Sequence, residues 1–165
     1  MNDALYEQLV ARRQRPADYG VRILCILLVV GTAVLGFPFL GFFAFFIALL
    51  LALAVYYLVF PRLNVEYEYV LLNHDMQVDI IINQEKRKKK LEFDIQSAEI
   101  IAPSSSPRLS SYKPDKIYNF STGEEKTAYS IMMPLDQKNV CIILNPDETM
   151  LRHMSQWTGR RLYRD

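Results

Sequence analysis

The strongest candidate for chemistry in this sequence is a run of five basic residues, Lys86, Arg87, Lys88, Lys89 and Lys90. Cationic side chains held beside an anionic lipid leaflet gain about 1 kcal/mol each, so the run could contact lipid headgroups. A second interpretation is a solvated hairpin whose lysines protect a sheet edge. Nucleic acid is not an expected partner, because carboxylates surround the run: Glu66, Glu68, Asp75, Asp79, Glu85, Glu92 and Asp94.

A second basic group, Arg152, Arg160, Arg161 and Arg164, lies near the C-terminus. It could meet a phosphate or a carboxylate partner. Cations at the end of a helix more often complement the helix dipole, and the sequence leaves both interpretations open.

Residues suited to catalysis or metal binding are few. His74 falls in an expected turn and His153 on an expected helix, and we interpret both as exposed polar side chains. Cys25 and Cys141 lack the spacing of a metal or redox motif and are interpreted as small apolar residues. The sequence contains no metalloprotease, phosphate-loop or serine-hydrolase motif. We therefore expect no enzyme activity, no catalytic residue, no cofactor and no metal.

An uncharged apolar block dominates the elements around these residues. From Ile23 to Phe60 there is no Asp, Glu, Lys or Arg, which is about twice the 20 residues that one membrane span needs. Gly36, Phe37, Pro38 and Gly41 lie near its middle, where two glycines and a proline can break a helix and form a tight turn. We expect a transmembrane hairpin over 21–60, with helices at about 21–36 and 39–60 and a turn near 36–38. A single kinked span with a re-entrant stub is the alternative.

The basic residues that flank the block predict its orientation. Arg12, Arg13, Arg15 and Arg22 precede the first expected helix, Arg62 follows the second, and the turn carries no basic residue. Because short cytoplasmic segments are enriched in Lys and Arg, both termini are predicted to be cytoplasmic.

Residues 1–20 are expected to form a cytoplasmic segment with a short helix. Leu5 and Leu9 recur at helical spacing, and Asn2 or Asp3 could cap the helix. Such a helix could lie at the membrane interface, bind a partner or simply lead into the first span. The polar lead does not resemble a cleavable signal, so the apolar block is expected to stay in the mature protein.

After Pro61 the hydrophobic period changes to two, which predicts a strand-rich domain over 62–165 that can fold alone. The loop at 103–115 is rich in Ser and Pro and is expected to be exposed. Asn145 as N-cap and Pro146 at the first position predict a C-terminal helix. The strands are expected at 65–72, 76–82, 88–95, 98–102, 116–121, 127–133 and 139–144.

About seven antiparallel strands capped by one C-terminal helix is the element order of a pleckstrin-homology-like (PH-like) α+β domain. The chain also resembles a family of small bacterial two-helix membrane proteins with a C-terminal PH-like domain of unassigned function. The residues that carry the resemblance include Glu66 to Tyr69, Ile100 to Pro103, Asn145 to Glu148 and Arg161 to Asp165. The resemblance implies a PH-like fold in a bacterial, multi-pass protein of the cytoplasmic membrane. It supplies no activity and no site residues.

The preferred functional hypothesis is a membrane-anchored interaction module that contacts the lipid bilayer and either anionic headgroups or a protein partner. The alternative is an accessory subunit of a membrane transport or secretion assembly. That alternative is disfavoured because the apolar block has no charge and only Thr32 as a non-aromatic hydroxyl, whereas conduction paths carry such groups. The oligomeric state does not follow from the sequence.

Overall fold

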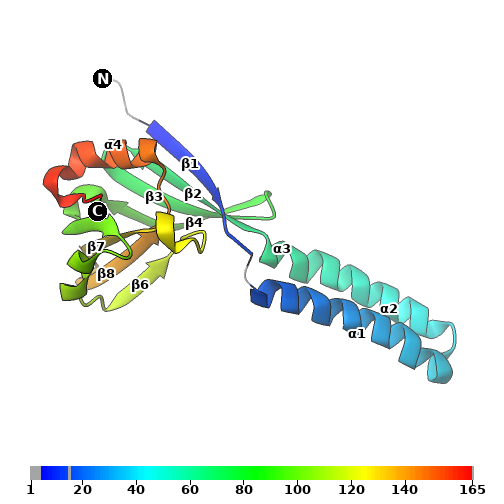
Figure 1. Ribbon diagram of the computed structural model, residues 1–165. Helices are drawn as coiled ribbons and strands as arrows, with labels where there is room; N and C mark the ends of the chain where they lie inside the picture. The colour runs from blue at the N-terminus through cyan, green and yellow to red at the C-terminus, as the bar shows by residue number, and fades with distance from the viewer. Residues whose placement is uncertain (1–4, 15, 165) are drawn as a thin grey trace. The chain divides into compact units, whose positions relative to one another are not determined.

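The computed structural model describes residues 5–14 and 16–164. The chain divides into two units: a helical hairpin at 14–65, and a β-rich domain that combines 1–13 with 66–165. Figure 1 shows the strands of the domain and the antiparallel helices of the hairpin. The hairpin is therefore an insertion into the domain and does not precede it.

The hairpin consists of α1 (Pro16–Leu40), α2 (Phe43–Ala54), a π-helical turn (Val55–Val59) and α3 (Phe60–Leu63). The second arm, from Phe43 to Leu63, is 21 residues long, and α1 is 25 residues long. At 1.5 Å per residue they measure about 31 and 37 Å, against about 30 Å for a hydrocarbon layer. Both are long and apolar enough to span a membrane.

The reversal between the helices lies at Gly41 and Phe42, so the expected turn near 36–38 is wrong. Gly41 adopts a φ of +55°, and its N–H donates to the carbonyl of Phe37 at 2.8 Å. This is a left-handed C-cap, a conformation that favours glycine. Pro38 lies inside α1, within its last turn.

Gly36 contributes to packing and does not break α1. A Cβ atom placed on Gly36 would lie 3.1 Å from the Cβ of Ala44 in α2. Ala44 is fully buried and Ala48, one turn later, is almost fully buried. Small side chains therefore let the two helices approach closely, as is common between membrane helices.

The first sheet contains β1 (Leu5–Ala11), β2 (Val65–Leu72), β3 (Asp75–Ile82) and β4 (Lys86–Asp94), in that order. Strand β1 pairs antiparallel with β2, with Leu5 opposite Leu72 and Ala11 opposite Glu66. The expected N-terminal helix is thus wrong over Leu5–Ala11, which form a strand, and its expected cap at Asn2 or Asp3 lies outside the described residues. The expected domain boundary at residue 62 also leaves out this strand.

The second sheet contains β5 (Ile100–Pro103), β6 (Lys116–Asn119), β7 (Tyr129–Leu135) and β8 (Lys138–Leu144). Its strand order is β5-β7-β8-β6, and β6 runs parallel to β8. Among the described residues there are therefore eight strands and one parallel pair, where about seven antiparallel strands were expected.

The main core joins both sheets and the C-terminal helix α4 (Glu148–Thr158). The ring of Tyr67 packs edge-on against Phe120, and the hydroxyl of Tyr69 donates to the carbonyl of Phe120 at 2.5 Å. Burial raises the pKa of Tyr69 well above its ordinary value, so this hydroxyl stays protonated. Helix α4 buries Met150 and Met154 completely.

The second sheet is covered on its other face as well. Ile100, Ala102, Met132 and Cys141 form a smaller apolar cluster there. Residues of the expected exposed loop at 103–115 pack on this cluster through Leu109 and Tyr112, joined by Tyr163 from the C-terminal segment. Part of the loop forms a 3₁₀ turn, Pro107–Ser111, so the loop serves as a cover for the sheet.

The N-cap of α4 is Asp147, whose side chain accepts from the N–H of Met150 at 2.7 Å, so the expected cap at Asn145 is wrong. Asn145 is instead a buried connector. Its Oδ1 accepts from the N–H of Thr122 at 2.7 Å, and its Nδ2 donates to the carbonyl of Glu124 and to Oγ1 of Thr127. One amide thereby satisfies three groups of the loop before β7.

Side-chain hydrogen bonds join strand β1 to the start of α4. The hydroxyl of Tyr6 donates to Oδ2 of Asp147 at 2.5 Å. The side chain of Gln8 donates to the carbonyl of Asn145 at 3.0 Å and accepts from the N–H of Asp147 at 2.9 Å. The N-terminal strand therefore helps to hold the C-terminal helix.

Candidate functional site

The basic run predicted from the sequence lies on β4, which is an edge strand of the first sheet. All five side chains, from Lys86 to Lys90, are exposed. Lysines on an edge strand discourage pairing with another chain, so the edge-protecting interpretation fits this position. The same exposure makes the side chains available to an anionic surface.

The strand register divides the run between the two faces of the sheet. Arg87 lies opposite Ile81 on β3. Its Nη2 atom is 2.6 Å from Oε1 of the nearly buried Glu68, and the two residues form an ion pair. Lys89 forms an ion pair with Glu92 three residues later. These two cations are therefore already neutralised by carboxylates of the domain.

Lys86, Lys88 and Lys90 differ from these two residues. Lys86 lies opposite Ile82 and Lys88 opposite Ile80, and Lys90 occupies the irregularity where the register shifts between Val78 and Asp79. Within residues 5–14 and 16–164, none of the three lysines forms an ion pair. We call these three residues the free lysine set.

The free lysine set begins at the end of the sheet where the chain joins the helical hairpin and extends to Lys90 in the middle of β4. In the turn before β4, Nε2 of Gln84 donates to Oε1 of Glu66 at 3.3 Å. Glu66 is the first residue of the domain after the hairpin, and Ala11, opposite it on β1, is near the exit point at Arg13. We call this the tethered end of the sheet.

Two arginines of the second basic group, Arg161 and Arg164, make contacts within the domain itself. Arg161 donates through Nη1 to the carbonyls of Gln96 at 2.7 Å and Ala98 at 2.8 Å, and through Nε to that of Thr158. Arg164 forms an ion pair with Glu148. Arg152 and Arg160 are exposed. The residues of this group do not converge on one site.

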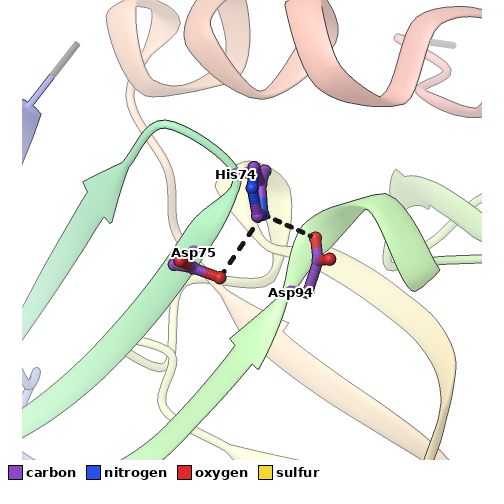
Figure 2. A group of neighbouring side chains, drawn as sticks. All are labelled: His74, Asp75 and Asp94. Carbon is purple, nitrogen blue, oxygen red and sulfur yellow. Dashed lines mark ion pairs between the residues drawn. The ribbon is translucent and has the colours of Figure 1, made fainter. Parts of the chain in front are cut away.

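His74 belongs to a cluster that the sequence interpretation missed. Its Nδ1 lies 3.4 Å from Oδ1 of Asp75 and 3.2 Å from Oδ1 of Asp94, and Figure 2 shows the imidazole with the two carboxylates. The signal was available only through the register, because Asp75 and Asp94 are directly opposite each other on β3 and β4. The other histidine, His153, is half-buried and stacks on the ring of Tyr6 at 5.4 Å.

A polar cavity of about 380 Å³ lies at the end of β5 near the start of β7. Its lining includes Ser104, Asn119, Ser121 and Glu125, and it has no basic side chain among the described residues. The hydroxyl of Ser104 bonds that of Ser130 at 2.8 Å and has no histidine beside it. The cavity therefore shows neither an activated nucleophile nor an anion-binding site.

Cys141 is a buried residue of the apolar cluster on the second sheet. Burial raises the pKa of its thiol, which disfavours the reactive thiolate. This environment is typical of a structural cysteine.

A family model described as "Bacterial PH-like domain (DUF6106)" matches residues 2–164. No curated protein and no solved structure matches the chain. The match includes the helical hairpin and the strand that precedes it, so the inserted architecture is part of what the family model describes. The chain belongs to the bacterial PH-like domain family DUF6106.

Proposed function

We propose that residues 14–65 cross the bacterial cytoplasmic membrane twice and hold the PH-like domain at its cytoplasmic surface as an interaction module. The two helices have the required length and composition. Pairing of β1 with β2 brings the two ends of the hairpin to one sheet, which supports a double crossing with both ends on one side. Arg12, Arg13 and Arg62 flank the hairpin and favour the cytoplasmic side.

In this proposal the ligand is an anionic phospholipid headgroup, and the free lysine set makes the contact. The observation that carries the proposal is the position of these lysines at the tethered end. Glu66 follows the end of α3 at Leu63 by three residues, and an extended chain advances about 3.5 Å per residue. Glu66 therefore stays within about 10 Å of the helix end, and the turn that bonds to it precedes the lysines directly.

The expected energy is large enough to orient the domain. Three unpaired lysines near an anionic leaflet contribute about 3 kcal/mol together, or roughly a 150-fold preference. Because the Debye length is about 8 Å at physiological salt, the attraction acts only near the surface. Arg87 and Lys89 should add less, since carboxylates already neutralise them.

Lysine footprinting of the full chain in lipid nanodiscs tests the contact. The chain is acetylated in discs of phosphatidylcholine alone and in discs containing 30% phosphatidylglycerol, and each lysine is followed by mass spectrometry. We expect Lys86, Lys88 and Lys90 to react at least threefold more slowly in the anionic discs, and high salt should abolish the difference. Three exposed lysines elsewhere in the domain should react equally in both: Lys113, Lys116 and Lys138.

A matched pair of triple variants separates specific contact from total charge. Changing Lys86, Lys88 and Lys90 to Gln should remove the protection from hydrogen exchange that anionic lipid gives the β3–β4 turn. Changing Lys113, Lys116 and Lys138 to Gln should leave that protection in place. Equal lysine labelling in both kinds of disc at low salt would overturn the lipid contact and leave a protein as the module's partner.

A further inference from the structure

The cluster of His74, Asp75 and Asp94 lies at the opposite end of the β2–β3 hairpin from the free lysine set. His74 occupies the turn after β2, Asp75 begins β3, and Asp94 ends β4. The backbone is fixed at this point, because the N–H of Ile95 donates to the carbonyl of His74 at 2.9 Å. The three side chains are thereby brought together by strand register and one tight turn.

The side chains are also held in place from outside the cluster. The imidazole of His74 packs edge-on against Trp157 of α4, with ring centroids 5.6 Å apart. Oδ1 of Asp94 accepts from the N–H of Gln96 at 2.8 Å, which restricts the carboxylate. The cluster is therefore largely formed before any ligand arrives, as a binding site requires.

Two features of the cluster call for a positive ion. Asp75 and Asp94 face each other directly across two antiparallel strands, and like charges in that position destabilise a sheet. The Nδ1 atom of His74 is buried and has no hydrogen-bond partner among the described residues, although both carboxylates are near. An imidazole nitrogen in this position can bind a metal ion.

The distances in the cluster are those expected between ligands of one metal ion. Two ligands of one tetrahedral zinc, each about 2.0–2.1 Å from the metal, lie about 3.3 Å apart. The two distances from Nδ1 are 3.2 and 3.4 Å, and neither contact has hydrogen-bond geometry. The three ligand atoms lie within 4.8 Å of one another, so a small rotation of the exposed Asp75 side chain would complete the set.

We propose that His74, Asp75 and Asp94 bind one divalent transition-metal ion of the zinc class. Nδ1 of His74 supplies the nitrogen ligand, and one oxygen of each aspartate supplies the others. An imidazole donor favours zinc, cobalt or nickel, whereas calcium and magnesium prefer oxygen ligands alone. Because both aspartates are exposed, the fourth position is open to water or to a donor group from another molecule.

Trp157, the only tryptophan in the chain, reports on this site because it touches the ring of His74. The full chain is purified in a non-ionic detergent through a histidine-free tag and titrated with Co²⁺ at pH 7.5. We expect saturable quenching of Trp157 fluorescence with one equivalent bound, reversal by Zn²⁺, and cobalt absorption bands of a low-coordinate site. Mg²⁺ should neither quench nor compete.

Two substitutions at the site and two controls locate the ion. Asp94→Asn preserves the shape of the side chain and should weaken Co²⁺ binding at least tenfold, and His74→Asn should abolish it. His153→Ala removes the only other histidine, and Asp136→Asn removes an exposed turn carboxylate; both should bind as the wild type does. Absence of saturable quenching up to 100 µM Co²⁺, or unchanged binding by Asp94→Asn and His74→Asn, would overturn the proposal.

Discussion

Large apolar side chains are exposed on the helical hairpin and buried in the β-rich domain. Leu35 and Phe39 of α1 are 73% and 89% exposed, whereas Leu71 of β2 is 1% exposed. The domain removes its large side chains from water through its own packing. The hairpin buries mainly the small residues Ala44 and Ala48 and leaves its large ones outside. This difference is what the proposed membrane crossing requires, because large apolar side chains of the hairpin would then face lipid.

The two regions are nevertheless not consecutive in the sequence. The hairpin is inserted between β1 and β2, which are neighbours in one sheet. The domain therefore closes only after both arms of the hairpin have been made, with β1 pairing across the insertion. The comparison predicts that removing β1 lowers the stability of the domain much more than substitutions in the hairpin do.

The largest effect is expected from removing β1. Deleting residues 1–11 of the full chain removes a strand ladder and the bonds of Tyr6 and Gln8 to the start of α4, at an expected cost of about 4 kcal/mol or more. Urea unfolding followed by Trp157 fluorescence measures the loss. The control, Leu5→Ser with Leu9→Ser, changes only exposed side chains and should be mild.

The same reasoning changes the expectation for isolated fragments. Residues 62–165 alone lack β1 and should aggregate or melt without cooperativity. Residues 5–13 joined to 66–165 by a short loop should be soluble and fold cooperatively, because Ala11 and Glu66 are directly opposite. A cooperative melt for both fragments would show that β1 is dispensable.

A smaller effect is expected from Asn145→Ala in the domain. The substitution removes the side chain that bonds to Thr122, Glu124 and Thr127, and leaves these three polar groups without that partner. The expected loss of unfolding free energy is about 2–3 kcal/mol. Asn139→Ala, at an exposed position, is the control and should change it by less than about 0.5 kcal/mol. Equal effects would mean that Asn145 is not a connector.

The corresponding change in the hairpin is Gly36→Leu. A side chain at this position meets Ala44 at once, so the helices must move apart at a cost of about 1–3 kcal/mol. Gly31→Leu is the control, since a Cβ there meets nothing within 4 Å. Unfolding of the helix pair in mixed detergent micelles should be easier for Gly36→Leu only. Urea unfolding of the domain, read from Trp157, should be the same for both variants.

The smallest effect concerns Tyr6 at alkaline pH. The hydrogen bond to Asp147 raises the pKa of Tyr6 above its ordinary value of 10.0. Because the folded pKa is the higher one, the bond stabilises the domain fully below pH 10 and loses its effect as the pH rises through the raised value. Tyr6→Phe should reduce stability near neutral pH and flatten this alkaline loss. Tyr112→Phe, at a hydroxyl outside this bond, should keep the wild-type profile.

The parts of the fold that could be predicted from the sequence are those set by local pattern. The uncharged block predicted the helix pair, and the period of two after Pro61 predicted most strands within a few residues. Strand β1 was missed because Leu5 and Leu9 also fit a helical spacing, and because its partner lies beyond the whole hairpin. Gly36 and Gly41 look alike in sequence, and only the packed helices distinguish the packing residue from the cap.

At the candidate sites, too, contacts between distant residues could not be predicted from the sequence. The basic run is visible as a run, but its division into paired and free cations depends on Glu68 of β2, which lies two strands away in the sheet. The cluster around His74 depends on Asp94, twenty residues later, whose position follows from the register of β3 and β4. Sequence reasoning can recognise the residue types at both sites. It cannot assemble contacts that only strand pairing creates.

The most direct test of the account is paramagnetic quenching of backbone NMR signals from the full chain in nanodiscs. A lipid-bound nitroxide and a water-soluble gadolinium chelate are added in separate experiments. We predict that residues 21–60 are broadened by the lipid probe and spared by the water probe, and that the core strands of the domain are spared by the lipid probe. Broadening of 21–60 by the water probe, with no response to the lipid probe, would contradict the account.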